Sequence, residues 1–416
     1  MINIVAFFNL TLFATLLIGP MACEDVVPVT SEELTTLNLT PEEEKKVRLD
    51  NDFTLALFNQ AVSEMREGDN MLLSPISANM VLSMLSNGAA GTTQDSLHRA
   101  LAFGDFSQIQ VNQYYHKLLS SLPRLDSATT LDIANSIWYR NDFNALPAFL
   151  ETNRQYYQAE VSALDFASPA AKGTINRWVS DHTQGKIPEI IDQISAEKMM
   201  YLINAIYFKG IWQEPFDAGR TNKLPFSIPG GKSVEADFMN AERSFHVLSG
   251  DQLQGIELPY GNGQFSMVIL MPRESSVVQF VRTLTADRIG EIYSGFAKRR
   301  TNLFLPKFQF AYENTLNDEL SRLGMGIAFT DQADFSGLAK ESLLVDQVKQ
   351  KTFIEVNEEG TEAAAVTSVG VSVTSMPIVE TLRFDQPFVF LIRENNCGLV
   401  LFTGIMNDPT QRAVTD

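Results

Sequence analysis

A long apolar run from Met199 to Phe208 constrains the fold of this chain more than any other segment. Its composition is typical of a β-strand, and a strand that is apolar on both faces must be covered on both of them. We therefore expect a central strand in a large sheet, with other elements packed above and below it.

The order of the other elements indicates an α+β fold. Apolar residues at helical spacing predict a first helix over Phe53–Met65, beginning near Asp50 or Asp52, and a second helix that begins at Ser74-Pro75 with Ser74 as its cap. Helices therefore cluster early and strands late, which favours α+β over a regular βαβ alternation. Further helices are expected over Phe149–Tyr157 and Thr174–Gln184, and strands over Leu131–Tyr139, Phe265–Met271, Asn302–Phe310, Thr352–Asn357, Phe388–Arg393 and Leu399–Gly404.

The composition excludes several classes of function. The chain has 32 Lys and Arg against 50 Asp and Glu, a net charge of −18, whereas nucleic-acid binding needs clustered bases. Two cysteines, Cys23 and Cys397, are too few for a disulfide framework or a Cys-rich zinc site. Because no metal-binding spacing, GxSxG elbow or phosphate loop is present either, we expect no nucleic-acid partner, no metal or cofactor, and no enzyme activity.

The N-terminus is expected to direct export. Residues 2–18 are nearly all apolar and small residues follow, which is typical of a signal peptide over residues 1–22; a membrane anchor is the alternative, although the run is short for one. Residues 23–45 are rich in acids and are expected to form an extended tether. Ala22-Cys23 is similar to a bacterial lipoprotein cleavage site, so Cys23 is either lipidated or part of a plainly secreted protein. We expect an extracellular location in both cases.

One segment near the C-terminus does not fit an ordinary strand. The 17 residues Ala363–Val379 carry no charge and are rich in Ala, Val, Ser and Thr. Read with period two, Thr361, Ala363 and Ala365 fall on one side and Glu362 on the other, as in a half-buried strand. The segment is either an ordinary Ala-rich strand or loop, or a strand that is first exposed and later inserted.

Several separated strings resemble the serpin family of serine protease inhibitors. The resemblance covers about residues 46–409 and implies a serpin domain over residues 46–416. Such a domain has a large central β-sheet with two smaller sheets, about eight to nine helices, and an exposed reactive loop at about residues 358–380. The strings that carry the resemblance are Asn70–Ser77, Asn204–Trp212, Leu303–Phe308, Leu323–Met325 and Phe384–Ile392.

The string Val356–Ala365 is similar to the hinge of the family's reactive loop and indicates an inhibitory member. By this resemblance a cleaved loop slides into the central sheet, where bulk or charge would clash or be desolvated. The small side chains of this string suit that insertion. The hinge residues are Glu358, Gly360, Thr361, Ala363 and Ala365.

The resemblance also implies a suicide-substrate mechanism. A serine protease cuts the loop, remains bound as an acyl-enzyme and is trapped when the loop inserts as a strand. Counting from Glu358 places the cleaved bond at Thr374–Ser375, within one or two residues. Val371 and Val373 suit elastase-like or subtilisin-like proteases, and cross-class inhibition of cysteine proteases is an extension of the same trap. Met376 is a weaker candidate because Pro377 follows it.

Five further residues match the family's sheet-opening region, and their alternative roles are structural. Ser74 is a helix cap as well as a candidate, and Gln350 stands where the family usually has a histidine. The set consists of Ser74, Ser77, Asn204, Trp212 and Gln350.

A non-inhibitory role remains as the alternative to inhibition. A serpin can act as a non-inhibitory carrier or chaperone, but the small-residue hinge argues against that function here. Residues 95–126 offer only Arg99, Lys117 and Arg124, so heparin is not expected as a cofactor. The expected partners are target serine proteases, held covalently by a protein that is otherwise a monomer.

Overall fold

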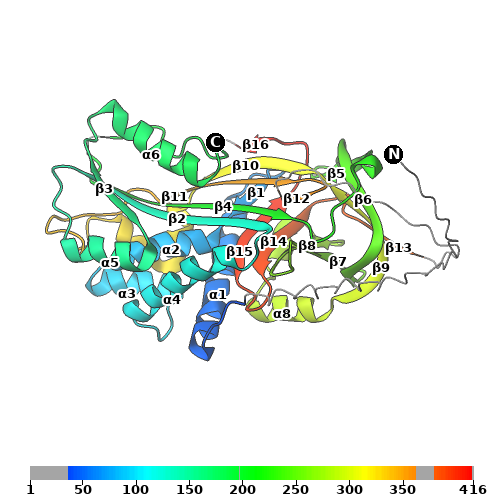
Figure 1. The fold of residues 1–416 in the computed structure, drawn as a ribbon, viewed down its shortest axis with the longest axis horizontal. Coiled ribbons are helices and arrows are strands. Elements are labelled where there is room, and N and C mark those ends of the chain that lie inside the picture. Colours follow the sequence, from blue (N-terminus) through cyan, green and yellow to red (C-terminus); the bar gives the residue numbers. More distant parts are fainter. Residues whose placement is uncertain (1–35, 196, 362–378, 415–416) are drawn as a thin grey trace, which may run out of the picture. The chain divides into compact units, whose positions relative to one another are not determined.

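Two β-sheets organise the computed structural model, which describes residues 36–195, 197–361 and 379–414 (Figure 1). Within these residues a seven-stranded sheet has the order β16-β10-β11-β12-β4-β2-β3, and a nine-stranded sheet has the order β1-β15-β14-β8-β7-β6-β9-β13, with β5 paired to β6. The α+β class is therefore confirmed. The seven-stranded sheet comprises β2 (Thr129–Arg140), β3 (Glu160–Leu164), β4 (Met200–Ile211), β10 (Phe308–Thr315), β11 (Lys349–Val356), β12 (Gly360–Thr361) and β16 (Ala413–Val414).

The nine-stranded sheet joins what we expected to be two smaller sheets. Its longest strand, β6, has 18 residues and pairs with β5 at one end, with β7 at the other and with β9 along most of its length. Because one strand serves both regions, their ladders are continuous. The strands are β1 (Met71–Leu73), β5 (Asn222–Ile228), β6 (Lys232–Ser249), β7 (Leu253–Pro259), β8 (Phe265–Pro272), β9 (Ala297–Pro306), β13 (Glu380–Arg383), β14 (Phe388–Glu394) and β15 (Val400–Met406).

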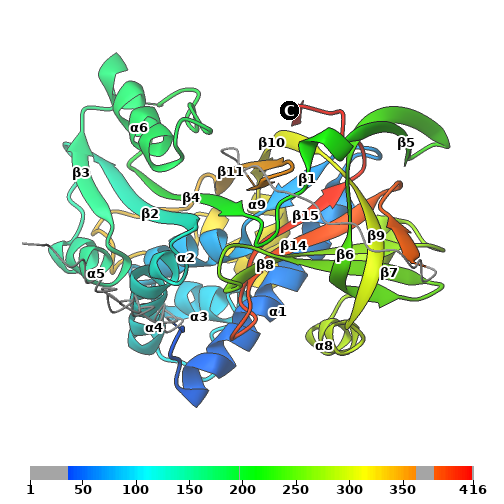
Figure 2. The same cartoon turned by 45° about the vertical axis from the view of Figure 1, so that its right-hand side comes forward.

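Helices cover both faces of the seven-stranded sheet. In Figures 1 and 2, α6 stands over one face near β2, β3 and β4, whereas α2 lies under the other face. Of the twelve residues of α2, eleven are buried. The described helices are α1 (Pro41–Glu64), α2 (Pro75–Ser86), α3 (Gly91–Ala100), α4 (Gln108–Ser121), α5 (Pro147–Tyr157), α6 (Pro169–His182), α7 (Val277–Val281), α8 (Ala286–Ser294) and α9 (Asn317–Leu320).

The apolar run of β4 is buried on both faces, as its sequence predicts. Ile203 and Ala205 belong to a small core with Trp178 of α6. Ile206 and Phe208 belong to the main core between the two sheets. The alternation of a strand sends these pairs to opposite faces, so β4 separates the two cores.

Two expected boundaries are wrong. Helix α1 begins at Pro41 rather than near Asp50, because Thr40 and Glu43 form a capping box, each side chain bonding the other residue's backbone N–H. The last residues of the expected extended tether are therefore helical. The single strand expected over Asn302–Phe310 is two strands, β9 and β10, which are separated at Lys307.

In the part of the chain that the structure describes, no helix combines the length and the apolar character needed to span a bilayer. The apolar N-terminal run of residues 2–18 lies outside that part.

Candidate functional site

The two-residue strand β12 lies between β4 and β11 and joins them. Gly360 and Thr361 pair antiparallel with Ile211 and Gly210 of β4, and Thr361 also pairs with Val356 of β11. Among the described residues β4 and β11 have no ladder with each other, and β12 is the strand that stands between them. A strand between β4 and β11 therefore begins at β12.

Glycines make this close approach possible. Gly360 has φ +155°, and a Cβ atom there would lie 2.7 Å from the Cα of Ile211. A Cβ atom on Gly210 would lie 2.5 Å from the ring of Tyr260. Gly360 therefore excludes a side chain while β12 is paired with β4, and Gly210 excludes one because the Tyr260 ring packs against it.

Thr361 is already inserted in the uncut chain. Its side chain is 2% exposed, and its Oγ1 lies 2.7 Å from the hydroxyl of Tyr260. The Tyr260 ring stacks on Trp212 with 4.6 Å between ring centroids, and burial raises the pKa of Tyr260 far above its ordinary value. We expected Thr361 to enter the sheet only after cleavage. Its contact with Tyr260 instead shows that Thr361 lies in the sheet before the loop is cut.

The residues just before β12 are held by the chain that follows β4. The backbone N–H groups of Trp212 and Phe216 donate to the carbonyls of Glu359 and Glu358, both at 2.7 Å. The Trp212 indole N–H donates to the carbonyl of Asn357 at 2.9 Å. The expected hinge and Trp212 are therefore one hydrogen-bonded unit.

The carboxylate of Glu358 is anchored outside the sheet. Lys307 lies 2.8 Å from one carboxylate oxygen, and the hydroxyl of Thr221 donates to the other at 2.7 Å. Burial alone would raise the pKa of Glu358, but the bonds from Lys307 and Thr221 outweigh it and leave the pKa below its ordinary value. Glu358 is thus held as the charged form.

Four other candidate residues tie β4 and β11 to α2 instead of to each other. The Gln350 side chain of β11 bonds the backbone N–H and C=O of Ser74, at 2.9 and 2.8 Å. On β4, Asn204 accepts a hydrogen bond from the Ser77 hydroxyl and donates to Asn135 at 2.8 Å. The start of α2 is therefore a common anchor for β4 and β11, while Trp212 lies apart from it with the hinge.

The expected capping role of Ser74 is wrong. Ser74 occupies the N-cap position of α2, but its hydroxyl makes no cap bond and donates instead to the carbonyl of Leu401 at 2.9 Å. The backbone around Ser74 is already engaged by Gln350. Tertiary contacts thus replace the local bond.

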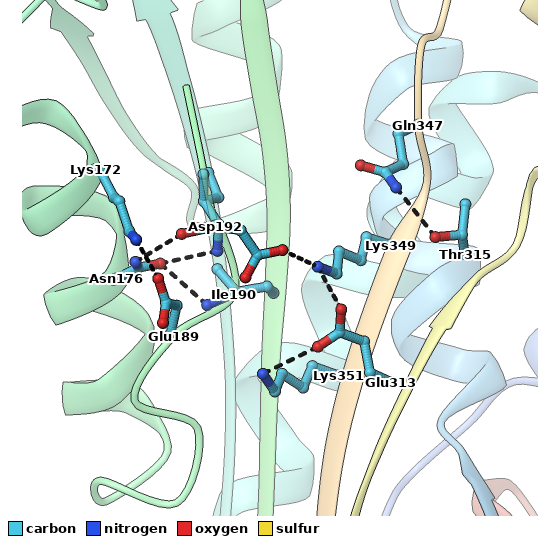
Figure 3. A network of polar contacts seen from close by, with 11 residues as sticks. Lys172, Asn176, Glu189, Ile190, Asp192, Glu313, Thr315, Gln347, Lys349 and Lys351 are labelled. Carbon is cyan, nitrogen blue, oxygen red and sulfur yellow. Dashed lines mark hydrogen bonds and ion pairs between the residues drawn. The ribbon is translucent and has the colours of Figure 1, made fainter. Parts of the chain in front are cut away.

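Ion pairs that the sequence reasoning missed cross from the segment after α6 to β11 (Figure 3). Asp192 lies 2.9 Å from Lys349, which also pairs with Glu313 of β10. The hydrogen bond from Lys349 lowers the pKa of Asp192 below its ordinary value. A second pair joins Lys186 to Glu355 at 3.5 Å. This set, which we call the clamp, fastens β11 to a segment that leads directly into β4.

Several candidate residues lie outside the described part of the chain. They are the possible lipidation site and the loop positions after the hinge: Cys23, Ala363, Ala365, Val371, Val373, Thr374, Ser375 and Met376. Their assignments remain predictions. Among the described residues, no group of three His, Cys, Asp or Glu side chains is arranged to hold a metal ion.

Comparisons with known proteins agree on one family. The model of the family described as Serpin (serine protease inhibitor) matches residues 48–409. The leukocyte elastase inhibitor of Sus scrofa is 32% identical over 372 residues, which cover 86% of this chain and 97% of that protein. Among solved structures, the thermophilic serpin Tengpin in its native state has a TM-score of 0.81 at 32% identity, over 89% of this chain and 95% of Tengpin. Thyroxine-binding globulin in complex with thyroxine has a TM-score of 0.80 at 26% identity, over 88% of this chain and 100% of that chain.

Proposed function

This chain belongs to the serpin family, whose members are protease inhibitors rather than enzymes, and we propose that it inhibits elastase-like or subtilisin-like serine proteases as a suicide substrate. The observation that carries the proposal is the two-residue strand β12, which begins a strand between edges of β4 and β11 that are otherwise unpaired in the described residues. An inserting loop needs such a place. The same trap extends to cysteine proteases, which also pass through an acyl-enzyme.

The proposed reaction starts as ordinary proteolysis. The serine hydroxyl of the protease attacks the carbonyl of Thr374, the bond to the nitrogen of Ser375 breaks, and an ester joins the protease to Thr374. The freed segment then continues β12 along the edges of β4 and β11. The completed strand of fourteen residues, 361–374, of which Thr361 already lies in the sheet, would span about 45 Å at ~3.3 Å per residue. The displaced protease loses its catalytic geometry, so hydrolysis of the ester stalls.

The alternative, a non-inhibitory carrier or chaperone, is not favoured. Thyroxine-binding globulin has the same fold, but fold likeness alone does not carry a ligand or an activity. The relative named as an elastase inhibitor is more similar in sequence, and the hinge string Thr361–Ala365 is small apart from Glu362. We propose that the protein acts as a monomer.

Incubation with a pancreatic-type elastase tests the function. A covalent complex that survives a denaturing gel is expected. The released C-terminal fragment should have the mass of residues 375–416, with Ser375 as its first residue. The variant Thr374→Arg should shift complex formation to trypsin, because a trypsin-like pocket requires Arg or Lys at that position. If every protease tried cuts the unmodified chain without forming a stable complex, the protein is a substrate and not an inhibitor, and the proposal fails.

Export, with or without a lipid anchor at Cys23, is part of the same proposal. The apolar run of residues 2–18 and the acids that follow support it. When the full chain is made in a bacterial host, the protein should partition into detergent, and Cys23→Ser should move it to the aqueous phase. Equal partitioning of the two forms would leave plain secretion.

A further inference from the structure

A cavity of about 410 Å³ lies directly beside the hinge. It is formed where the chain leaves β4, against the ends of β6, β7 and β9 and the turn after β14. This volume lies in the range of small-ligand sites. Its lining includes Trp212, Gln213 and Glu214, the start of the segment that holds Glu358 and Glu359.

The cavity is basic in a chain that is strongly acidic overall. Four of its lining residues carry basic side chains and two carry acidic ones; the bases are Arg243, His246, Lys298 and Arg393, and the acids are Glu214 and Glu257. A local excess of bases in a concave site favours anions over neutral molecules.

The two acids are already neutralised by protein partners. Glu257 accepts a hydrogen bond from Arg393 at 2.9 Å and lies 3.4 Å from the ring of His246, and Glu214 pairs with Arg243 at 3.4 Å. Lys298 is exposed and has no ion-pair partner within the described ranges. The cavity therefore keeps one cation that nothing in the described chain compensates.

The rest of the lining is polar. Gln213 and Ser244 are exposed at the cavity and can donate hydrogen bonds. These two side chains suit a ligand with hydroxyl groups as well as a negative charge.

We propose that this cavity binds a small hydroxylated carboxylate, of the size of a sugar acid, and that binding restrains the hinge. The carboxylate pairs with Lys298, and the hydroxyl groups bond Gln213 and Ser244. Restraint follows from the connection of the segment. Trp212 and Phe216 donate to Glu359 and Glu358 at 2.7 Å, so ordering Trp212–Glu214 also orders the start of β12.

Binding is tested on the full chain by ligand-observed nuclear magnetic resonance with D-glucuronate, and with D-glucose as the neutral match. Glucuronate should bind at least about tenfold more tightly than glucose at constant ionic strength, which corresponds to ~1.4 kcal/mol. Lys298→Gln should remove the preference. The control Lys232→Gln changes an exposed lysine of β6 outside this cavity and should keep it. Equal binding of both sugars, or an unchanged preference in Lys298→Gln, overturns the site.

Restraint is tested by hydrogen exchange of the peptide that contains Trp212 and Phe216. Saturating glucuronate should slow its exchange in the unmodified chain and leave it unchanged in Lys298→Gln; no slowing overturns the coupling. A regulatory consequence rests on the proposed function: glucuronate should raise the number of inhibitor molecules cut per elastase trapped. If no covalent complex with elastase forms at all, the proposed function fails, while the binding and exchange measurements still decide the site.

Discussion

Glu358 connects the hinge to the rest of the molecule through its backbone and through its carboxylate. Its backbone carbonyl accepts from Phe216, and its side chain is fixed by Lys307 and Thr221. Because the side chain is only 12% exposed, water does not readily replace these bonds. The carboxylate of Glu358 therefore helps to position the residues that lead into β12, together with the bonds from Trp212 and Phe216.

Glu358→Gln should destabilise the uncut protein by about 1 kcal/mol, since a charge-assisted bond becomes a neutral one at a partly buried site. The loss depends on pH. The folded pKa of Glu358 is lowered, so its contribution is complete above the ordinary pKa of about 4.3 and disappears as pH falls through the folded value. Unfolding midpoints of both forms, measured from pH 7 to pH 3, should converge at the acidic end. A difference that stays constant with pH would mean that the charge of Glu358 has no part in the effect.

In the strand that begins at β12, the orientation of Thr361 determines which of the following loop residues should point inward. Its side chain faces Tyr260 and the core, so period two sends Ala363 and Ala365 inward and Ala364 outward if β12 is extended. Ala365→Arg should therefore bring an unpaired charge into the sheet, at a cost of roughly several kcal/mol.

Elastase should cut the Ala365→Arg variant at the normal rate but should rarely remain covalently bound to it. Ala364→Arg carries the same charge on the solvent side and is the matched control. The ratio of inhibitor cut to elastase trapped should rise at least several-fold for Ala365→Arg only. Similar ratios for the two variants would contradict the strand register and the insertion together.

The clamp should slow the separation of β4 and β11. Asp192→Asn removes its contact with Lys349 and leaves the pair of Lys349 with Glu313 in place. We expect this variant to unfold faster in urea, by roughly two- to threefold for the loss of one exposed ion pair. Lys172→Gln is the control, because Lys172 pairs with Glu189 and does not reach β11.

The same effect should appear in the unmodified protein at acidic pH. Because Lys349 lowers the folded pKa of Asp192, the contribution of this pair is complete above about 3.9 and is lost as pH falls through the folded value. Unfolding rates of Asp192→Asn and the unmodified chain should then coincide at low pH. Should Lys172→Gln accelerate unfolding equally, the effect would not come from the link to β11.

Elements were more predictable from the sequence than the contacts between them. The burial of β4 on both faces follows from its apolar run, and the hinge follows from a family resemblance. The start of α1 was detectable, since Thr40 and Glu43 have capping-box spacing, but the surrounding acids suggested an extended tether. The clamp was not detectable, because Asp192 and Lys349 are 157 residues apart and only the folded chain brings them together.

For the whole molecule, we expect the uncut fold to be kinetically trapped and not the most stable arrangement of this chain. Within the described ranges the edges of β4 and β11 lack a mutual ladder, and β12 is the one described strand between them. Filling that place with a full strand would add backbone hydrogen bonds and bury the small side chains of the loop.

The most direct test compares thermal unfolding of the intact protein with that of the protein cut in its loop by a metalloprotease, which forms no acyl-enzyme and so is not trapped, and then purified. We expect the cut protein to unfold at a markedly higher temperature than the intact protein, because the loop is then a strand between β4 and β11. A cut protein that unfolds at the same temperature as the intact one, or at a lower temperature, would contradict loop insertion in this chain.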